Sequence, residues 1–110
     1  MNNNINNPPD FIFKKDKTRL LKLQRKVILD QVKRDIDVYV SSYKFELNDH
    51  QTRSAIKTEI TRYLDSPLIK GLVISNKVTV HTTHVGDIKV NVYIKPKWSR
   101  SYAKMQWRLN

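Results

Sequence analysis

The chain contains no cysteine and only two glycines, and each shortage excludes a class of chemistry. Without cysteine there is no disulfide, thiolate nucleophile or thiolate metal ligand, which suits a reducing compartment. Two glycines are too few for a glycine-rich phosphate-binding loop. The sequence also has no run of about 18 apolar residues, and residues 1–9 lack the apolar core of a signal peptide. These absences predict a protein of an aqueous compartment.

Acidic residues are scarce as well, since 10 Asp and Glu oppose 21 Lys and Arg and leave a formal charge of +11. The positive charge is concentrated in two segments. The first runs from Lys14 to Lys26 with the lone acid Asp16, and the second runs from Lys89 onward with no acid. The pattern predicts an anionic partner, and nucleic acid, an anionic membrane or an acidic protein surface would each satisfy it.

A length of 110 residues with 39% hydrophobic residues allows one compact domain. Residues 1–16 are rich in Asn and contain Pro8 and Pro9, a composition that predicts a flexible, extended N-terminal arm before a domain spanning 17–110. Three apolar residues, Phe11, Ile12 and Phe13, interrupt the arm. They either fold onto the domain's own core or form a strand donated to the sheet edge of another subunit, and the residues favour neither.

Two segments have the periodicity of amphipathic helices. The first is expected from about Lys17 to Ser41, where apolar positions recur at three- and four-residue steps: Leu21, Ile28, Val32, Ile36, Tyr39 and Tyr43, with Leu20, Val27 and Val40 widening the stripe. Asn48 and Asp49 then supply N-cap oxygens for a second helix, whose end we place at Pro67. Its apolar stripe is Ile56, Ile60, Tyr63 and Leu64.

Beyond Gly71 the period changes to the alternation of β-strands. The alternating apolar residues are Val78 and Val80; Ile88, Val90, Val92 and Ile94; and Ala103, Met105, Trp107 and Leu109. Residues 84–87 form a hairpin turn in which Gly86 is free to take a positive φ. The sequence therefore predicts an α+β fold, with two helices packed on a small three-stranded antiparallel sheet and an extended N-terminal arm. A sheet this small has edges whose unpaired backbone groups invite another chain.

Candidate catalytic and metal-binding groups are sparse. His81 and His84 are three apart on a strand, which sends them to opposite faces, and few acids lie nearby to complete a metal site. Asp35 and Asp37 diverge on their helix and make a poor acid–base pair. We therefore expect no enzyme activity, no metal and no cofactor.

Aromatic residues among the C-terminal cations are typical of a nucleic-acid surface. They are Trp98, Tyr102 and Trp107, of which Trp107 lies on the apolar alternation and is expected in the core. No recognition motif accompanies them. A small basic nucleic-acid-binding protein is therefore kept as the alternative function.

Several short motifs, in order, resemble the C-terminal core domain of bacteriophage tail sheath proteins. Residues 43–53 contain Phe-Glu-Leu-Asn-Asp and then Thr-Arg, similar to the sheath signature Phe-Glu-Pro-Asn-Asp with Thr-Arg, Leu47 standing where the family usually has Pro. Residues 60–64 resemble the end of the family's helix, and residues 70–72 resemble its Gly-containing turn. Residues 90–96 resemble the family's penultimate strand, which closes on proline, and the final alternation resembles its C-terminal strand. The resemblance covers residues 17–110. The Glu-Pro-Arg motif typical of sheath initiators is absent, and a chain of this size has no room for the outer domains of a complete sheath subunit.

The resemblance implies a subunit that exchanges strands with its neighbours. Phe11, Ile12 and Phe13 would form the donated arm, and Met105, Gln106, Trp107, Arg108 and Leu109 the receiving or donating C-terminal strand. A basic inner face commonly meets an acidic tail tube in this family, which makes Lys57, Arg62 and Lys70 candidates for tube-facing residues.

The function implied is that of a structural component of a contractile phage tail, acting as a sheath initiator or a minimal sheath-like ring subunit. Its expected partners are the tail sheath protein, the tail tube protein, the baseplate wedge proteins and further copies of itself in a ring. Neither a membrane nor a nucleic acid is expected as a partner under this hypothesis, and no cofactor is. The expected location is the virion, after assembly in the host cytoplasm.

Overall fold

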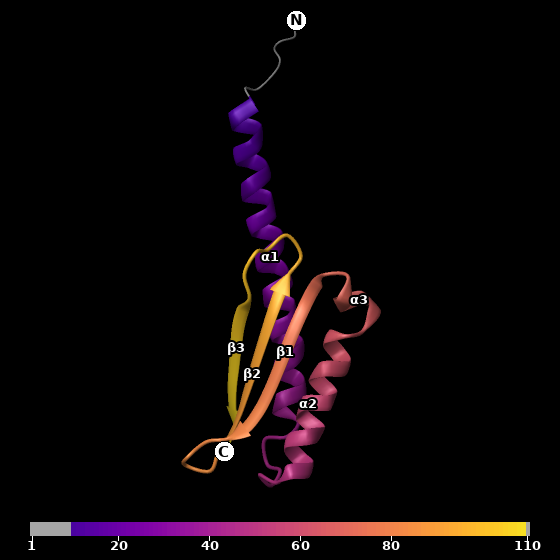
Figure 1. Ribbon diagram of the computed structural model, residues 1–110, viewed down its shortest axis with the longest axis vertical. Coiled ribbons are helices and arrows are strands. Elements are labelled where there is room, and N and C mark those ends of the chain that lie inside the picture. Colours follow the sequence, from indigo (N-terminus) through magenta and orange to yellow (C-terminus); the bar gives the residue numbers. More distant parts are fainter. Residues whose placement is uncertain (1–9, 110) are drawn as a thin grey trace, which may run out of the picture.

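The computed structural model describes the backbone of residues 10–109 and the side chains of residues 19–109. The elements follow in the order α1 (Asp10–Ser41), α2 (His50–Leu64), α3 (Pro67–Lys70), β1 (Val73–Thr82), β2 (Ile88–Pro96) and β3 (Ala103–Leu109) (Figure 1). The three strands form one antiparallel sheet in the order β1-β2-β3. In Figure 1 the strands lie in front of α1, and α2 lies beside β1. The predicted α+β class, with two long helices on a three-stranded meander, is confirmed.

Helix α1 begins at Asp10 rather than at residue 17. No Pro or Gly occurs between Asp10 and the end of α1, so no residue in that span breaks the helix. Its first turns project beyond the sheet (Figure 1). Of the arm predicted over 1–16, residues 10–16 belong to this helix and residues 1–9 lie outside the described residues. The side chains of Phe11, Ile12 and Phe13 also lie outside the described ones, so their donation to another subunit stays a prediction.

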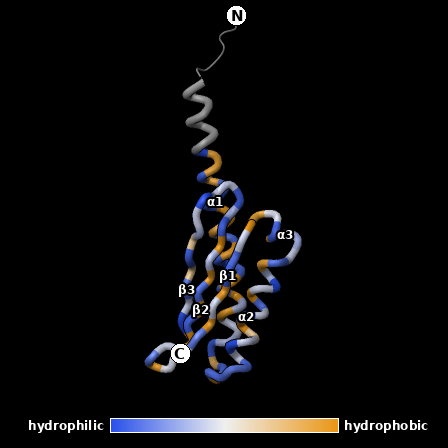
Figure 2. The backbone as a smooth tube through the Cα atoms, viewed as in Figure 1, coloured by the Kyte–Doolittle hydropathy of each residue, from blue (hydrophilic) through white to orange (hydrophobic). Residues whose placement is uncertain are grey.

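The core lies between the two long helices and one face of the sheet. Figure 2 shows hydrophobic and hydrophilic residues alternating along the strands, as a sheet with one covered face requires. The buried apolar residues are Ile28, Val32, Ile36 and Val40 of α1; Ile56, Ile60 and Leu64 of α2; Ile69 of α3; Val73 and Val78 of β1; Ile88, Val90, Val92 and Ile94 of β2; and Met105 and Leu109 of β3. Leu20 and Val27, which were expected to widen the α1 stripe, are instead 55% and 66% exposed.

Helix α2 starts as its sequence indicates, with Asp49 as N-cap. The Asp49 side chain accepts a hydrogen bond from the Thr52 backbone N–H at 2.8 Å, and this bond lowers the pKa of the carboxyl. The end of α2 differs from the prediction, because the helix stops at Leu64 and Pro67 opens the separate short helix α3. Proline is as well suited to a first helical position as to ending a helix, so a proline alone does not distinguish the two.

The hairpin between β1 and β2 has the predicted turn. Gly86 has a φ of +93°, and the Thr83 backbone N–H donates to the Asp87 carbonyl at 2.8 Å. This turn fixes the register in which Val78 pairs with Val92, and Met105 of β3 pairs with Val92 from the other side. Since the register sets which residues share a face, it also determines the composition of both sheet faces.

Polar side chains tie the helices to each other and to β3. The Tyr63 hydroxyl donates to Asp35 of α1 at 2.5 Å, and burial together with this carboxylate raises the pKa of Tyr63. The rings of Tyr39 and Tyr63 lie 5.4 Å apart. Trp107 is partly buried against the core as its position in the alternation indicated, and its indole N–H donates to Asp37. These contacts give Asp35 and Asp37 structural roles.

Candidate functional site and interaction surfaces

Strand β3 forms one edge of the sheet. It pairs with β2 from Ile94–Ala103 to Ile88–Leu109, and no strand of the described part of the chain lies on its other side. In an antiparallel strand alternate residues direct their backbone N–H and C=O away from the existing partner. Met105 and Leu109 are buried toward the helices, whereas Gln106 and Arg108 are exposed. The residues predicted for strand exchange, Met105 to Leu109, therefore lie on an edge strand.

The residues predicted to face a tail tube, Lys57, Arg62 and Lys70, are all exposed and lie on two different helices. Lys57 and Arg62 are five residues apart on α2, which separates them by about 140° around the helix axis. Lys70 ends the separate helix α3. Lys57 and Arg62 therefore diverge around α2, and contact of the three cations with a tail tube stays a prediction.

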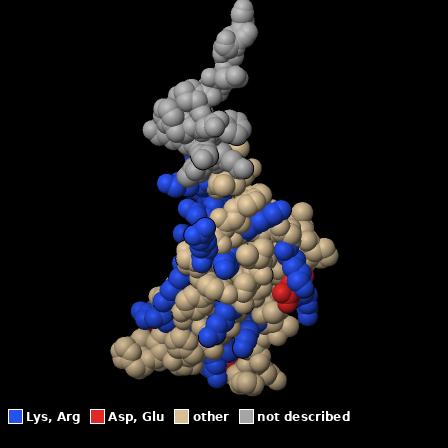
Figure 3. Space-filling model, turned by 45° about the horizontal axis from the view of Figure 1, so that its top comes forward, with Lys and Arg blue, Asp and Glu red and all other residues tan. Residues whose placement is uncertain are grey.

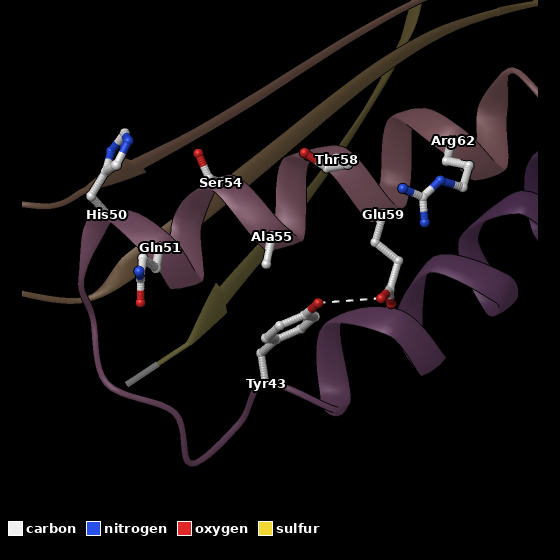
Figure 4. A pocket seen from close by; sticks show the side chains of 8 residues that line it. All are labelled: Tyr43, His50, Gln51, Ser54, Ala55, Thr58, Glu59 and Arg62. Atoms are coloured by element: carbon white, nitrogen blue, oxygen red, sulfur yellow. Dashed lines mark hydrogen bonds between the residues drawn. The ribbon is translucent and has the colours of Figure 1, made fainter.

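A polar hollow of about 500 Å³ lies between the end of α1 and α2 (Figure 4). Its lining residues are Tyr43, His50, Gln51, Ser54, Ala55, Thr58, Glu59 and Arg62. The Tyr43 hydroxyl donates to Glu59 at 3.2 Å, and burial followed by the Glu59 charge raises the pKa of Tyr43. In Figure 4, His50 and Ser54 point away from this pair. The side chains that line the hollow therefore do not converge as a nucleophile and its base.

The two histidines near the hairpin occupy different elements. His81 lies on β1 and His84 in the turn, and both are exposed. Among the side chains that the structure describes, no group of three or more His, Cys, Asp or Glu comes together to hold an ion.

None of the helices over residues 10–109 has both the length and the apolarity needed to cross a membrane.

The sheet face away from the helices is strongly basic. Cross-strand neighbours form four rows on it: Ser75 with Lys95; Lys77, Tyr93 and Lys104; Thr79, Asn91 and Gln106; and His81, Lys89 and Arg108. Neither Asp nor Glu occurs in any of the three strands. Figure 3, turned by 45° from the view of Figure 1, shows Lys and Arg over much of this side of the molecule and little acid. We call this surface the open basic face.

A hollow of about 440 Å³ opens on this face and is lined by Lys77, Thr79, Tyr93 and Tyr102. Tyr102 is 52% exposed, and its hydroxyl lies 2.6 Å from the Ser75 hydroxyl, which fixes its position over the sheet. The Lys104 ammonium lies 5.8 Å from the centre of the Tyr93 ring. The hollow therefore combines two aromatic rings with cations on both neighbouring strands.

Asn91, in the row next to the hollow, is a buried polar residue with an exposed fraction of only 6%. Its side-chain amide N–H donates to the Thr79 hydroxyl at 3.4 Å, while its carbonyl oxygen has no hydrogen-bond partner among the described residues. A buried acceptor without a donor lowers stability, so a water or a ligand that donates a hydrogen bond to this oxygen would stabilise the protein.

The three aromatic residues singled out in the sequence occupy different places. Trp107 bonds to α1 on the covered side of the sheet. Trp98 lies between β2 and β3 with a φ of +68°, and only Tyr102 reaches the open basic face. There it lines the same hollow as Tyr93, a residue that the sequence analysis did not single out. The signal was present in the polar alternation of β2, where Tyr93 falls between Asn91 and Lys95.

No protein-family model, curated protein sequence or solved structure matches this chain.

Proposed function

We propose that this protein is a structural component of a contractile phage tail, acting as a sheath initiator or a minimal sheath-like ring subunit that joins its neighbours by exchanging strands. Two lines of reasoning support the proposal. The sheath-like motifs of residues 43–53, 60–64, 70–72 and 90–96 occur in order along the chain. The elements that carry them follow the helix, helix and meander order expected from the resemblance.

The observation on which the proposal mainly rests is the position of β3 at the edge of the sheet. Seven residues of regular strand, Ala103–Leu109, have a strand partner on one side only within the described chain. Such an edge pairs readily with an extended segment of another chain, because backbone hydrogen bonds supply affinity whatever the side chains are. In the proposed assembly that segment is the one around Phe11, Ile12 and Phe13 of a neighbouring copy or of a sheath subunit.

The absence of cysteine makes disulfide mapping a direct test of this pairing. Ile12→Cys in one preparation is mixed with Gln106→Cys in a second and oxidised, and we expect disulfide-linked pairs joining the two variants. Lys57→Cys, exposed on α2 and away from the β3 edge, is the matched control. Linkage of Ile12→Cys to Lys57→Cys as readily as to Gln106→Cys would contradict strand exchange at β3.

A second test concerns the tail itself. Deletion of residues 1–13 should leave a folded chain that no longer joins growing sheath, as seen by electron microscopy. Normal sheath growth would refute the arm's role.

A third test concerns the tail tube. Purified tail tube should retain the full chain in a salt-dependent manner. Reversing Lys57, Arg62 and Lys70 to Glu should abolish retention, whereas reversing the exposed α1 residues Lys22, Lys33 and Arg34 should not. Equal loss in both variants indicates attraction by net charge and contradicts a specific tube-facing set.

A further inference from the structure

The open basic face has no role in strand exchange, which uses backbone groups at the β3 edge. Its cations are Lys77, Lys89, Lys95, Lys104 and Arg108, spread over all three strands. Arg108 lies 3.7 Å from Asp87, and the four lysines form no ion pair with another residue of the described side chains. Their combined positive potential therefore extends into solvent, where it attracts a polyanion.

Aromatic rings on this face restrict the kind of polyanion. Tyr93 lies on the central strand between Lys77 and Lys104, and Tyr102 forms another wall of the same hollow. Rings flanked by cations are the arrangement on which unpaired nucleobases stack while their phosphates meet the lysines. In duplex DNA the bases are stacked within the helix, so a duplex offers this surface phosphates alone.

Asn91 offers a polar atom that a nucleobase can use. Its unpartnered carbonyl oxygen needs a hydrogen-bond donor. Carboxylate groups and backbone phosphates accept hydrogen bonds and do not donate one, whereas an unpaired base can donate, through the exocyclic amino group of cytosine or adenine or through the N3–H of thymine. This oxygen is itself buried, so a neighbouring side chain has to move aside for a base edge to reach it.

We propose that the open basic face binds single-stranded nucleic acid, with a base against Tyr93 and Tyr102 and the phosphates along the lysine rows. This function is separate from the proposed role in a tail and does not depend on it. The rows repeat about every 6.7 Å along the strands, so four rows extend over about 20 Å. A surface of that length accommodates a short stretch of single strand, comparable with the smallest sites of other single-strand binders.

The test measures binding of the full chain to fluorescently labelled dT12 by anisotropy at several salt concentrations. We expect affinity to fall as salt rises, with a logarithmic slope of about −0.7 for each phosphate contacted. An unlabelled duplex of equal length and polyglutamate of matched charge should both compete more weakly than dT12. Competition by either one as strong as that by dT12 overturns the proposal in favour of a general anion surface or an acidic protein partner.

Two matched charge variants locate the site. Lys77→Glu with Lys104→Glu alters the open basic face, and Lys22→Glu with Lys33→Glu alters exposed positions of α1. Both lower the formal charge from +11 to +7. The first pair should weaken dT12 binding at least tenfold more than the second and reduce the salt slope by about 1.4. Equal losses in the two variants overturn the proposal.

Tyr93→Leu separates stacking from charge, because it removes the ring and keeps every cation. We expect about tenfold weaker dT12 binding with an unchanged salt slope. Unchanged affinity would show that the ring takes no part and would overturn the stacking arrangement. Thermal melting checks the fold of each variant, and if the Glu substitutions unfold the chain, Lys77→Gln with Lys104→Gln serves instead.

Discussion

The two faces of the sheet differ although the same three strands supply both. On the covered face Val78, Val92 and Met105 form a buried row, and one residue along each strand Lys77, Tyr93 and Lys104 form a row on the open basic face. A slip of the register by one residue would exchange the two sets. The strand register therefore determines both which residues are buried and which charged residues face solvent, and the Gly86 turn helps to set that register.

The covered face contributes most of the stability of the fold, whereas the open basic face is available for binding. Each large apolar side chain buried on the covered face contributes about 1.5–3 kcal/mol. Charges held in solvent on the other face contribute about 0–1 kcal/mol even when they are paired. Substitutions on the open basic face should therefore change binding while leaving the fold intact, which makes the two faces separable by mutation.

The largest expected effect on stability comes from a pair of adjacent residues that lie on opposite faces of the sheet. Ile94 is fully buried on the covered face, and Lys95 follows it on the open basic face. Ile94→Ala should lower the free energy of unfolding by about 3 kcal/mol, because it removes apolar area and leaves a cavity. Lys95→Ala should change it by less than about 0.5 kcal/mol. Urea denaturation measures both, and comparable losses would show that the faces do not divide as described.

A smaller effect is expected from the polar contact that joins the helices above the covered face. Tyr63→Phe removes the hydroxyl that donates to Asp35 at 2.5 Å. We expect a loss of about 1.5 kcal/mol, since the contact is charge-assisted but partly exposed. Tyr102→Phe, which removes the hydroxyl contact with Ser75 on the exposed side, is the matched control and should cost less.

The pH dependence sharpens this prediction. The pKa of Tyr63 in the folded protein is raised above its ordinary value of 10.0 by burial and by Asp35. The unfolded chain then ionises first as pH rises, so the stabilisation is complete below about pH 10 and declines above it. The stability difference between the native chain and Tyr63→Phe should shrink between pH 9 and 11. A constant difference over that range would contradict the assigned cause.

Much of the fold follows from local signals in the sequence. Three signals each predicted an element that the structure has: the alternation over residues 88–94 and 103–109 predicted the strands β2 and β3, Gly86 predicted the turn, and Asp49 predicted the start of α2. The prediction was wrong where one local signal is compatible with two different structures. Pro67 was interpreted as a helix end and is a helix start, and the charged, Asn-rich N-terminal segment gave no sign that α1 begins at Asp10.

The surfaces were harder to predict, because they depend on pairing between distant residues. Each strand's polar positions were evident, but only the antiparallel register brings Lys77 beside Tyr93 and Tyr93 beside Lys104. The burial of Asn91 had no sequence signal at all, since a polar residue on the polar side of a strand is normally exposed. Conversely, the grouping of Lys57 with Arg62 neglected the 100° turn per residue of α2.

The smallest expected effect concerns Asn91, the residue of the open basic face that behaves as if it belonged to the covered one. Asn91→Val replaces an amide with an unpartnered buried oxygen by a β-branched apolar side chain suited to a central strand. We expect the free energy of unfolding to rise by about 0.5 kcal/mol, and dT12 binding to weaken. A gain in stability accompanied by a loss of binding would show that the fold tolerates this oxygen for the sake of a ligand. A loss of stability would instead show that the bond from Asn91 to Thr79 outweighs the unpartnered oxygen, and the structural basis for a donor ligand at this position would be gone.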